Sequence, residues 1–150
     1  MHTWFECKIQ YEKTMENGMN KKVTEPYLVD ALSFTEAEAR IIEEMTPYIS
    51  GEFTVSDIKR ARYSELFFAE DTEADRWFKC KLTFITLDEK SGSEKKTSTN
   101  VLVQATDLRD AVKKLDEGMK GSMADYIISS MAETAIMDVY PYSSEPNDKP

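Results

Sequence analysis

The sequence of 150 residues is poor in the residues on which common catalytic sites depend. Its one histidine, His2, lies near the start, where chains fray, so we expect no mechanism with a positioned imidazole base. Its five glycines form neither G-x-G-x-x-G nor G-x-x-x-x-G-K-[ST], the motifs of phosphate-binding loops. The two cysteines, Cys7 and Cys80, have no C-x-x-C partner and no nearby histidine, as a zinc site would require. We therefore predict no enzyme, no metal site and no cofactor.

Long apolar runs and an excess of basic charge are also missing. No stretch approaches the roughly 18 consecutive apolar residues of a membrane-spanning helix, and no signal segment is recognisable at the start. The 28 acidic and 19 basic side chains give a net charge of −9. An acidic total argues against strong nonspecific binding to nucleic acid but does not exclude a local basic surface. We expect a cytoplasmic protein without membrane contact.

Two segments of the chain repeat each other. Residues 4–11, WFECKIQY, return at residues 77–84 as WFKCKLTF, with both tryptophans and both cysteines in register. Further apolar positions match at offsets of 73 and 74. We interpret residues 1–142 as a single domain with a tandem duplication, in which repeat 1 covers about 3–68, an acidic linker covers 69–75 and repeat 2 covers about 76–142. The alternative is a chance recurrence in an unrepeated α+β domain. Residues 143–150 are predicted to be a disordered tail.

The patterns within each repeat predict two strands, a helix and a third strand. Residues 4–11 alternate apolar and polar, as a half-buried strand does, and Asn17-Gly18 predicts a hairpin turn. Ser33 and Asp107 occupy the capping positions of helices expected at about 34–45 and 108–118. Final strands are predicted near 53–68 and 126–140, with a bulge around 57–59. The predicted fold class is α+β, with six mainly antiparallel strands and two helices that share one core with pseudo-two-fold symmetry.

Strand alternation places Trp4 and Trp77 on the strand face opposite the apolar side chains, near Lys8, Lys79 and Lys81. An exposed tryptophan can stack on bases while ammonium groups contact phosphates, as in proteins that bind single-stranded nucleic acid. The alternative is that the other repeat, a loop or a second copy covers each indole, with lysine stems packed on the ring. Strand alternation also assigns both cysteines to the apolar face, so we interpret them as buried core residues, with a redox pair as the alternative.

The densest basic cluster is residues 59–63, KRARY, and repeat 2 has AETAI at the equivalent positions. Lys59, Arg60 and Arg62 are therefore candidates for contacts with phosphates. The alternative is a solvated strand whose charges oppose aggregation at a sheet edge.

The Trp-Phe-x-Cys-Lys segment, residues 27–31 and 33–39, and residues 121–126 resemble a family catalogued as domain of unknown function number 4494. The resemblance covers the chain to about residue 142. It implies a small intracellular protein of gut bacteria, their phages or mobile elements, in a DNA-metabolism setting. It supplies no catalytic or binding residues.

From the residues and the resemblance together, we predict a nonenzymatic binding module for single-stranded DNA or RNA. The candidate contacts are the two tryptophans for bases and six basic side chains for phosphates: Trp4, Trp77, Lys8, Lys59, Arg60, Arg62, Lys79 and Lys81. The alternative is a protein-interaction or regulatory module that self-associates or binds a partner through exposed aromatic side chains and strand edges.

Overall fold

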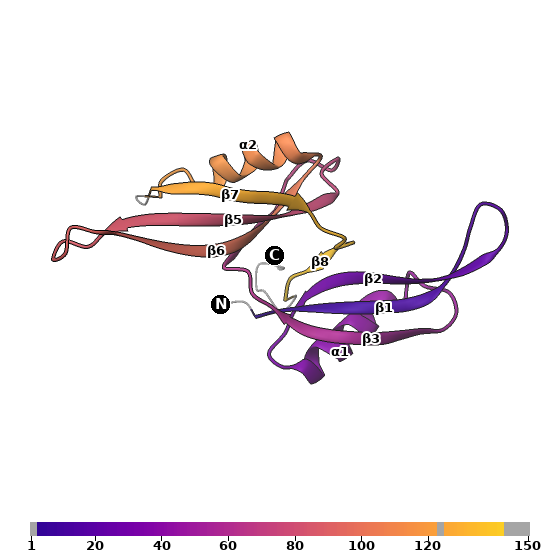
Figure 1. Cartoon of the computed structure of the whole chain (residues 1–150). Coiled ribbons are helices and arrows are strands. Elements are labelled where there is room, and N and C mark those ends of the chain that lie inside the picture. The colour runs from indigo at the N-terminus through magenta and orange to yellow at the C-terminus, as the bar shows by residue number, and fades with distance from the viewer. Residues whose placement is uncertain (1–2, 123–124, 143–150) are drawn as a thin grey trace, which may run out of the picture. The chain divides into compact units, whose positions relative to one another are not determined.

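A computed structural model describes residues 3–122 and 125–142 (Figure 1). These residues form two helices and eight strands, arranged in two four-stranded sheets. They divide into two compact units: unit 1 combines residues 3–62 with 135–142, and unit 2 consists of residues 63–122 and 125–134. The fold is α+β as predicted, but eight strands in two sheets replace the six that we expected. The predicted tail at 143–150 lies outside the described residues.

Unit 1 is a sheet with a helix on one face. Its sheet has the order β3-β1-β2-β8, in which β1 is antiparallel to both neighbours and β8 is parallel to β2. Its elements are β1 (Trp4–Thr14), β2 (Asn20–Asp30), α1 (Phe34–Met45), β3 (Phe53–Ala61) and β8 (Val139–Tyr140).

Unit 2 is also a sheet with a helix on one face, but its short parallel strand comes first along the chain, whereas that of unit 1 comes last. Its sheet has the order β4-β6-β5-β7, and here β4 is the strand that pairs in parallel, with β6. Its elements are β4 (Glu65–Phe67), β5 (Arg76–Leu87), β6 (Glu94–Ala105), α2 (Leu108–Gly118) and β7 (Tyr126–Glu133).

The final strand predicted for each repeat is broken in two. The first part, β3 or β7, pairs with a strand of its own repeat. The second part pairs with a strand of the other repeat, β4 with β6 and β8 with β2. Residues 62–64 and 134–138 lie between the two parts and are in no strand. This break accounts for the two additional strands, because each predicted long strand becomes two short ones.

Each unit has its own cluster of buried side chains between sheet and helix, so the prediction of one shared core is not confirmed. Alternate residues of the strands supply the sheet side of each cluster, and one stripe of the helix supplies the other. In unit 1 the buried members are Phe5, Cys7, Ile9, Val29, Ala31, Ala37, Ile41 and Met45. In unit 2 they are Phe78, Cys80, Leu82, Val101, Val103, Ala105, Ala111 and Leu115.

Both helices begin at the predicted capping residues. Ser33 Oγ accepts a hydrogen bond from the amide of Glu36 at 3.1 Å, and Glu36 Oε1 accepts one from the amide of Leu32 at 2.6 Å. At α2, Asp107 Oδ1 accepts from the amide of Asp110 at 2.8 Å. The amides of Glu36 and Asp110 belong to the first turns, which leave such groups without a partner in the helix, and the bond from Leu32 holds the residue before the cap.

A β-bulge recurs at the equivalent place in both units. The register between β1 and β3 shifts after Lys8 and leaves Ser56 as the additional residue on β3. The register between β5 and β7 shifts after Lys81 and leaves Ser129 as the additional residue on β7. The bulge in unit 1 lies next to the predicted position at residues 57–59.

Candidate functional site

Each sheet has one face that its helix covers and a second face, here called the far face, that the helix does not cover. Strand alternation and the observed register assign residues to it. On β5 the far-face residues of unit 2 are Trp77, Lys79, Lys81, Thr83, Ile85 and Leu87. The equivalent residues on β1 of unit 1 are Trp4, Glu6, Lys8, Gln10 and Glu12.

Trp4 and Trp77 lie on the far faces as predicted, but neither is accessible. Trp4 is 4% exposed and Trp77 is 2% exposed. A nucleic-acid base cannot reach either indole in this conformation, so the predicted stacking role is not available to these rings. Alternation predicts which face a strand residue occupies, but it contains no information on what covers that face.

Phe68 is an accessible aromatic side chain beside Trp77, and the sequence analysis missed it. The two rings meet edge to face, with centroids 5.5 Å apart, and Phe68 is 50% exposed. The amide of Ala69 donates to Gln104 Oε1 at 2.9 Å, and Gln104 lies opposite Trp77 in the register, so this bond holds Phe68 close to the far face. The adjacent pair Phe67-Phe68 could have predicted an exposed aromatic ring, because alternation turns only one of two neighbouring strand residues toward the core.

Lys79 and Lys81 are exposed on the far face of unit 2, where their Cα atoms are about 7 Å apart, the distance between alternate residues of a strand. Lys96 on β6 is also exposed and lies opposite Ile85. On the described strands β5, β6 and β7, Glu94 is the carboxylate on this face, at the far end of β6. Lys79 lies between Leu102 and Ala132, and Lys81 lies between Asn100 and Ser130, so every residue directly opposite these two lysines is uncharged.

Hydroxyl groups from three strands meet between Lys81 and Lys96. Thr83 Oγ1 on β5 is 3.2 Å from Ser98 Oγ on β6 and 2.5 Å from Ser129 Oγ at the bulge of β7. Thr83 is buried, whereas both serines are exposed. The far face of unit 2 therefore presents ammonium and hydroxyl groups, which are the side-chain donors that commonly bind phosphate oxygens.

The lysines on the far face of unit 1 have a different environment. Lys8 lies opposite Asp57, and Lys59 lies opposite Glu6. Opposite charges directly across an antiparallel pair attract each other, so each lysine has a carboxylate neighbour within its own sheet. Both lysines thus have a carboxylate directly opposite, in contrast to Lys79 and Lys81 on the equivalent face of unit 2.

The basic side chains of the cluster at residues 59–63 do not form one surface. Lys59 is on the far face, whereas Arg60 lies opposite Phe5 on the face that α1 covers. Arg62 follows the last residue of β3. All three side chains are exposed, but alternation distributes them over both sides of the strand, so a ligand on the far face meets Lys59 and not Arg60.

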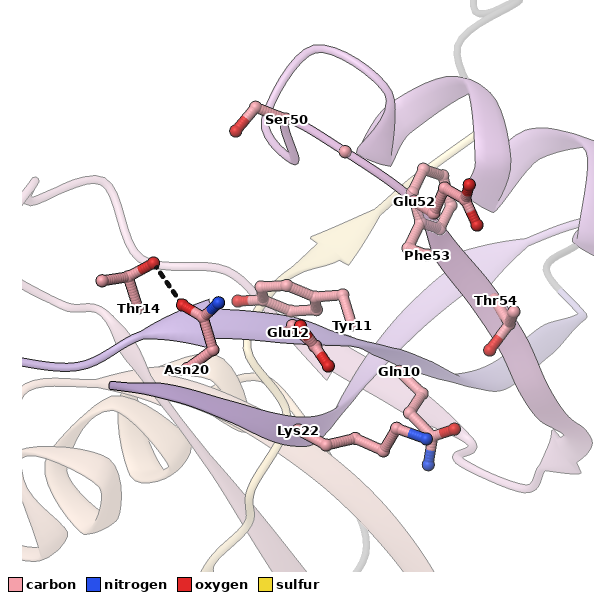
Figure 2. A pocket seen from close by; sticks show the side chains of 11 residues that line it. Gln10, Tyr11, Glu12, Thr14, Asn20, Lys22, Ser50, Glu52, Phe53 and Thr54 are labelled. Atoms are coloured by element: carbon pink, nitrogen blue, oxygen red, sulfur yellow. Dashed lines mark hydrogen bonds between the residues drawn. The ribbon is translucent and has the colours of Figure 1, made fainter. Parts of the chain in front are cut away.

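A pocket of about 570 Å³ lies in unit 1, where β1 and β2 continue as a hairpin past the start of β3 (Figure 2). Thr14 Oγ1 donates to Asn20 Oδ1 at 2.9 Å, a bond that links the two hairpin strands. The lining residues include no histidine or cysteine, and they offer polar contacts rather than a nucleophile with its base: Gln10, Tyr11, Glu12, Thr14, Asn20, Lys22, Ser50, Gly51, Glu52, Phe53 and Thr54.

Cys7 and Cys80 are free thiols without exposed surface, and each belongs to the core cluster of its own unit, as the core interpretation predicts. Burial raises the pKa of Cys7 to about 12 and that of Cys80 to about 11. The thiolate is the form that attacks substrates and binds metals, so both groups are poorly suited to these roles. Within residues 3–122 and 125–142, no group of three or more histidine, cysteine, aspartate or glutamate side chains is arranged to hold a metal ion.

The described elements thus define an α+β protein built from two units, each with a four-stranded sheet and one helix. Among these elements, neither helix is long and apolar enough to cross a membrane. Residues 3–142 match the family described as Domain of unknown function (DUF4494), and the chain belongs to this family. No curated protein and no solved structure matches the chain.

Proposed function

We propose that this protein is a nonenzymatic binding module that contacts the phosphate backbone of single-stranded nucleic acid with the far face of unit 2. The observation that carries the proposal is the contrast between the two far faces. Lys79 and Lys81 have uncharged residues opposite them, whereas Lys8 and Lys59 each lie opposite a carboxylate. Of these four lysines, Lys79 and Lys81 are therefore the two for which a ligand phosphate can supply a counter-charge that the sheet does not place opposite them.

The acidic total charge is compatible with this proposal, because a ligand responds to the local field of a surface. Three lysines on one face imply few phosphate contacts and hence weak binding. For single strands, log K falls with log[salt] by about 0.7 per phosphate contact, so three contacts predict a slope near −2.

Phe68 offers an accessible ring on which a nucleic-acid base can stack, and it lies against Trp77 at the end of the same face. Stacking of a base on an aromatic side chain contributes about 1–3 kcal/mol. In the proposed site, Trp77 packs against Phe68 and does not stack on a base. The site does not include the other predicted contacts, which are Trp4, Lys8, Lys59, Arg60 and Arg62. A DNA-metabolism setting in a phage or mobile element, in the cytoplasm, remains part of the proposal.

We infer that repeat 1 (about 3–68) and repeat 2 (about 76–142) arose by tandem duplication. The equal order of elements in residues 4–67 and 76–140, the recurrence of Trp and Cys 73 residues apart, and the bulges at Ser56 and Ser129 support this inference. The duplication explains why the two far faces are comparable, and their different charges suggest that only one copy kept or gained a ligand.

The test is fluorescence anisotropy of labelled oligothymidine titrated with the full chain at several salt concentrations. We expect weak binding at low salt, at least tenfold weaker binding by the K79A/K81A variant, and a salt slope that is smaller by about 1.4. K8A/K59A is the matched control, because it removes the same charge from the equivalent face of unit 1 and should change affinity less than twofold. F68A should weaken binding by fivefold or more. Absence of binding at low salt, or equal losses in the two double variants, would overturn the proposal.

A further inference from the structure

β7 forms one edge of the unit 2 sheet, and β5 is its strand neighbour among the described elements. Its sequence, YIISSMAE, contains no proline, no glycine and a single charged residue, Glu133, at its last position. The carboxylate of Glu133 is 3.7 Å from Nε of Arg76, which offsets its charge. An edge strand of this kind is a template for pairing with another strand, because its outer backbone groups are available for hydrogen bonds.

The equivalent edge strand of unit 1 has the features that oppose such pairing. β3 carries Asp57, Lys59 and Arg60, and charged side chains on an edge strand discourage the addition of a further strand. The corresponding residues of β7, 73 positions later, are Ser130, Ala132 and Glu133. Two of the three charges are therefore absent from β7, although the two strands have the same place in their sheets.

We propose that β7 pairs in an antiparallel manner with β7 of a second copy of this chain, about a two-fold axis between Ser129 and Ser130. In this register Ile128 lies opposite the second copy's Met131, and Ile127 lies opposite its Ala132. Residues that pair across two antiparallel strands must lie on the same face of the sheet, and the additional residue Ser129 makes this possible here. Ile128 and Met131 both lie on the helix side of the sheet, and Ile127 and Ala132 both lie on the far face.

The self-complementary pattern favours a second copy over a strand of another protein. Apolar residues meet apolar residues, and serines meet serines at the axis. The charged Glu133 lies at each end of the pairing, against Tyr126, so that the two carboxylates are far apart. A contact of this type is isologous and closes as a dimer. Pairing also covers Ile127, a large apolar side chain that is 50% exposed.

This inference does not depend on nucleic-acid binding, because the lysines of the far face lie on β5 and β6, one and two strands inward from the edge. If both proposals hold, the dimer joins two far faces of unit 2 into one continuous sheet of eight strands. Each proposal can fail alone, since one is measured by oligonucleotide binding and the other by mass.

The test is sedimentation velocity of the full chain over a concentration series. We expect a monomer–dimer equilibrium, a dissociation constant at least tenfold higher for I127K, and no change for T54K. Thr54 is the matched control because it is exposed at the equivalent position of β3, 73 residues earlier. Circular dichroism checks that both variants keep their secondary structure. A wild-type chain that is monomeric up to about 1 mM, or equal effects of I127K and T54K, would overturn the proposal.

A second substitution tests the register. In I127K/A132E, each new ammonium group faces a new carboxylate of the second copy, whereas within one chain the two positions lie at opposite ends of β7. We expect the double variant to recover most of the dimerisation that I127K loses. A folded double variant that stays as monomeric as I127K overturns the proposed two-fold pairing.

Discussion

The ring of Phe67 lies directly against Gly118, the last residue of α2. A Cβ built on Gly118 would be 2.6 Å from Cδ1 and 2.7 Å from Cε1 of that ring. Phe67 belongs to β4 and packs on the core cluster of unit 2. The missing side chain of Gly118 therefore allows β4 to approach the end of the helix.

We expect Gly118→Ala to destabilise the protein by about 1 kcal/mol. Alanine in a helix is more favourable than glycine by up to about 1 kcal/mol, but displacing a packed ring costs about 1–3 kcal/mol. Urea denaturation of the full chain measures the difference. In a Phe67→Ala background the same substitution should be neutral or stabilising, because the ring that it meets is gone. Stabilisation by Gly118→Ala with Phe67 present would contradict this account.

The two capping residues, Ser33 in unit 1 and Asp107 in unit 2, should contribute similar amounts to the free energy of unfolding. Ser33→Ala and Asp107→Ala each remove a side-chain acceptor for a first-turn amide, which typically costs about 1 kcal/mol. Thr35→Ala is the control, since Thr35 is exposed in the first turn of α1 and is not the cap. Thermal unfolding followed by far-ultraviolet circular dichroism should rank the two cap variants below wild type and the control close to it.

The stability of unit 2 should depend on pH through Asp110. Hydrogen bonds from Lys114, with Nζ 2.9 Å from Oδ2, and from the amide of Thr106 hold the pKa of Asp110 below its ordinary value. The ionised form therefore favours the folded state, and its contribution is present above about pH 4 and is lost as the pH falls through the lower folded value. Asp110→Asn should reduce stability at pH 7 and flatten the loss of stability below pH 4. Identical pH profiles for variant and wild type would exclude this role.

Both thiols should be nearly inert in the folded protein. With pKa values raised to about 12 for Cys7 and about 11 for Cys80, the thiolate fractions at pH 8 are about 10⁻⁴ and 10⁻³. A thiol-specific chromogenic reagent should react slowly in native buffer and with two groups in guanidinium chloride. As the pH rises, Cys80 should react before Cys7. Rapid labelling of either thiol without unfolding would show that its environment is not closed.

Local features of the fold could be predicted from the sequence because they depend on neighbouring residues. Ser33 and Asp107 identify the helix starts by their spacing to the residue three positions later. The alternation of residues 4–11 placed Cys7 in the core, and the recurrence at 77–84 extended that prediction to Cys80. The broken alternation near residue 57 located a bulge to within one or two residues.

Features that depend on distant residues could not be predicted in the same way. The apolar pattern near 63–67 predicts a strand, but it does not state that this strand pairs in parallel with β6, 36 residues further along the chain, counted from Glu65 to Val101. The burial of Trp4 and Trp77 depends on what covers the far faces, which periodicity does not describe. The different environments of Lys8 and Lys81 follow from register, because only register decides whether Asp57 or Ser130 lies opposite.

The position of strand β8 in the chain determines the order in which the two units can be completed during synthesis on the ribosome. This strand pairs with β2 in unit 1, yet it is translated after every residue of unit 2. Chains emerge from the ribosome N-terminal end first. A nascent chain that has just exposed residue 134 therefore contains all strands of unit 2 but lacks one strand of unit 1. The unit whose synthesis starts first is the last to be completed.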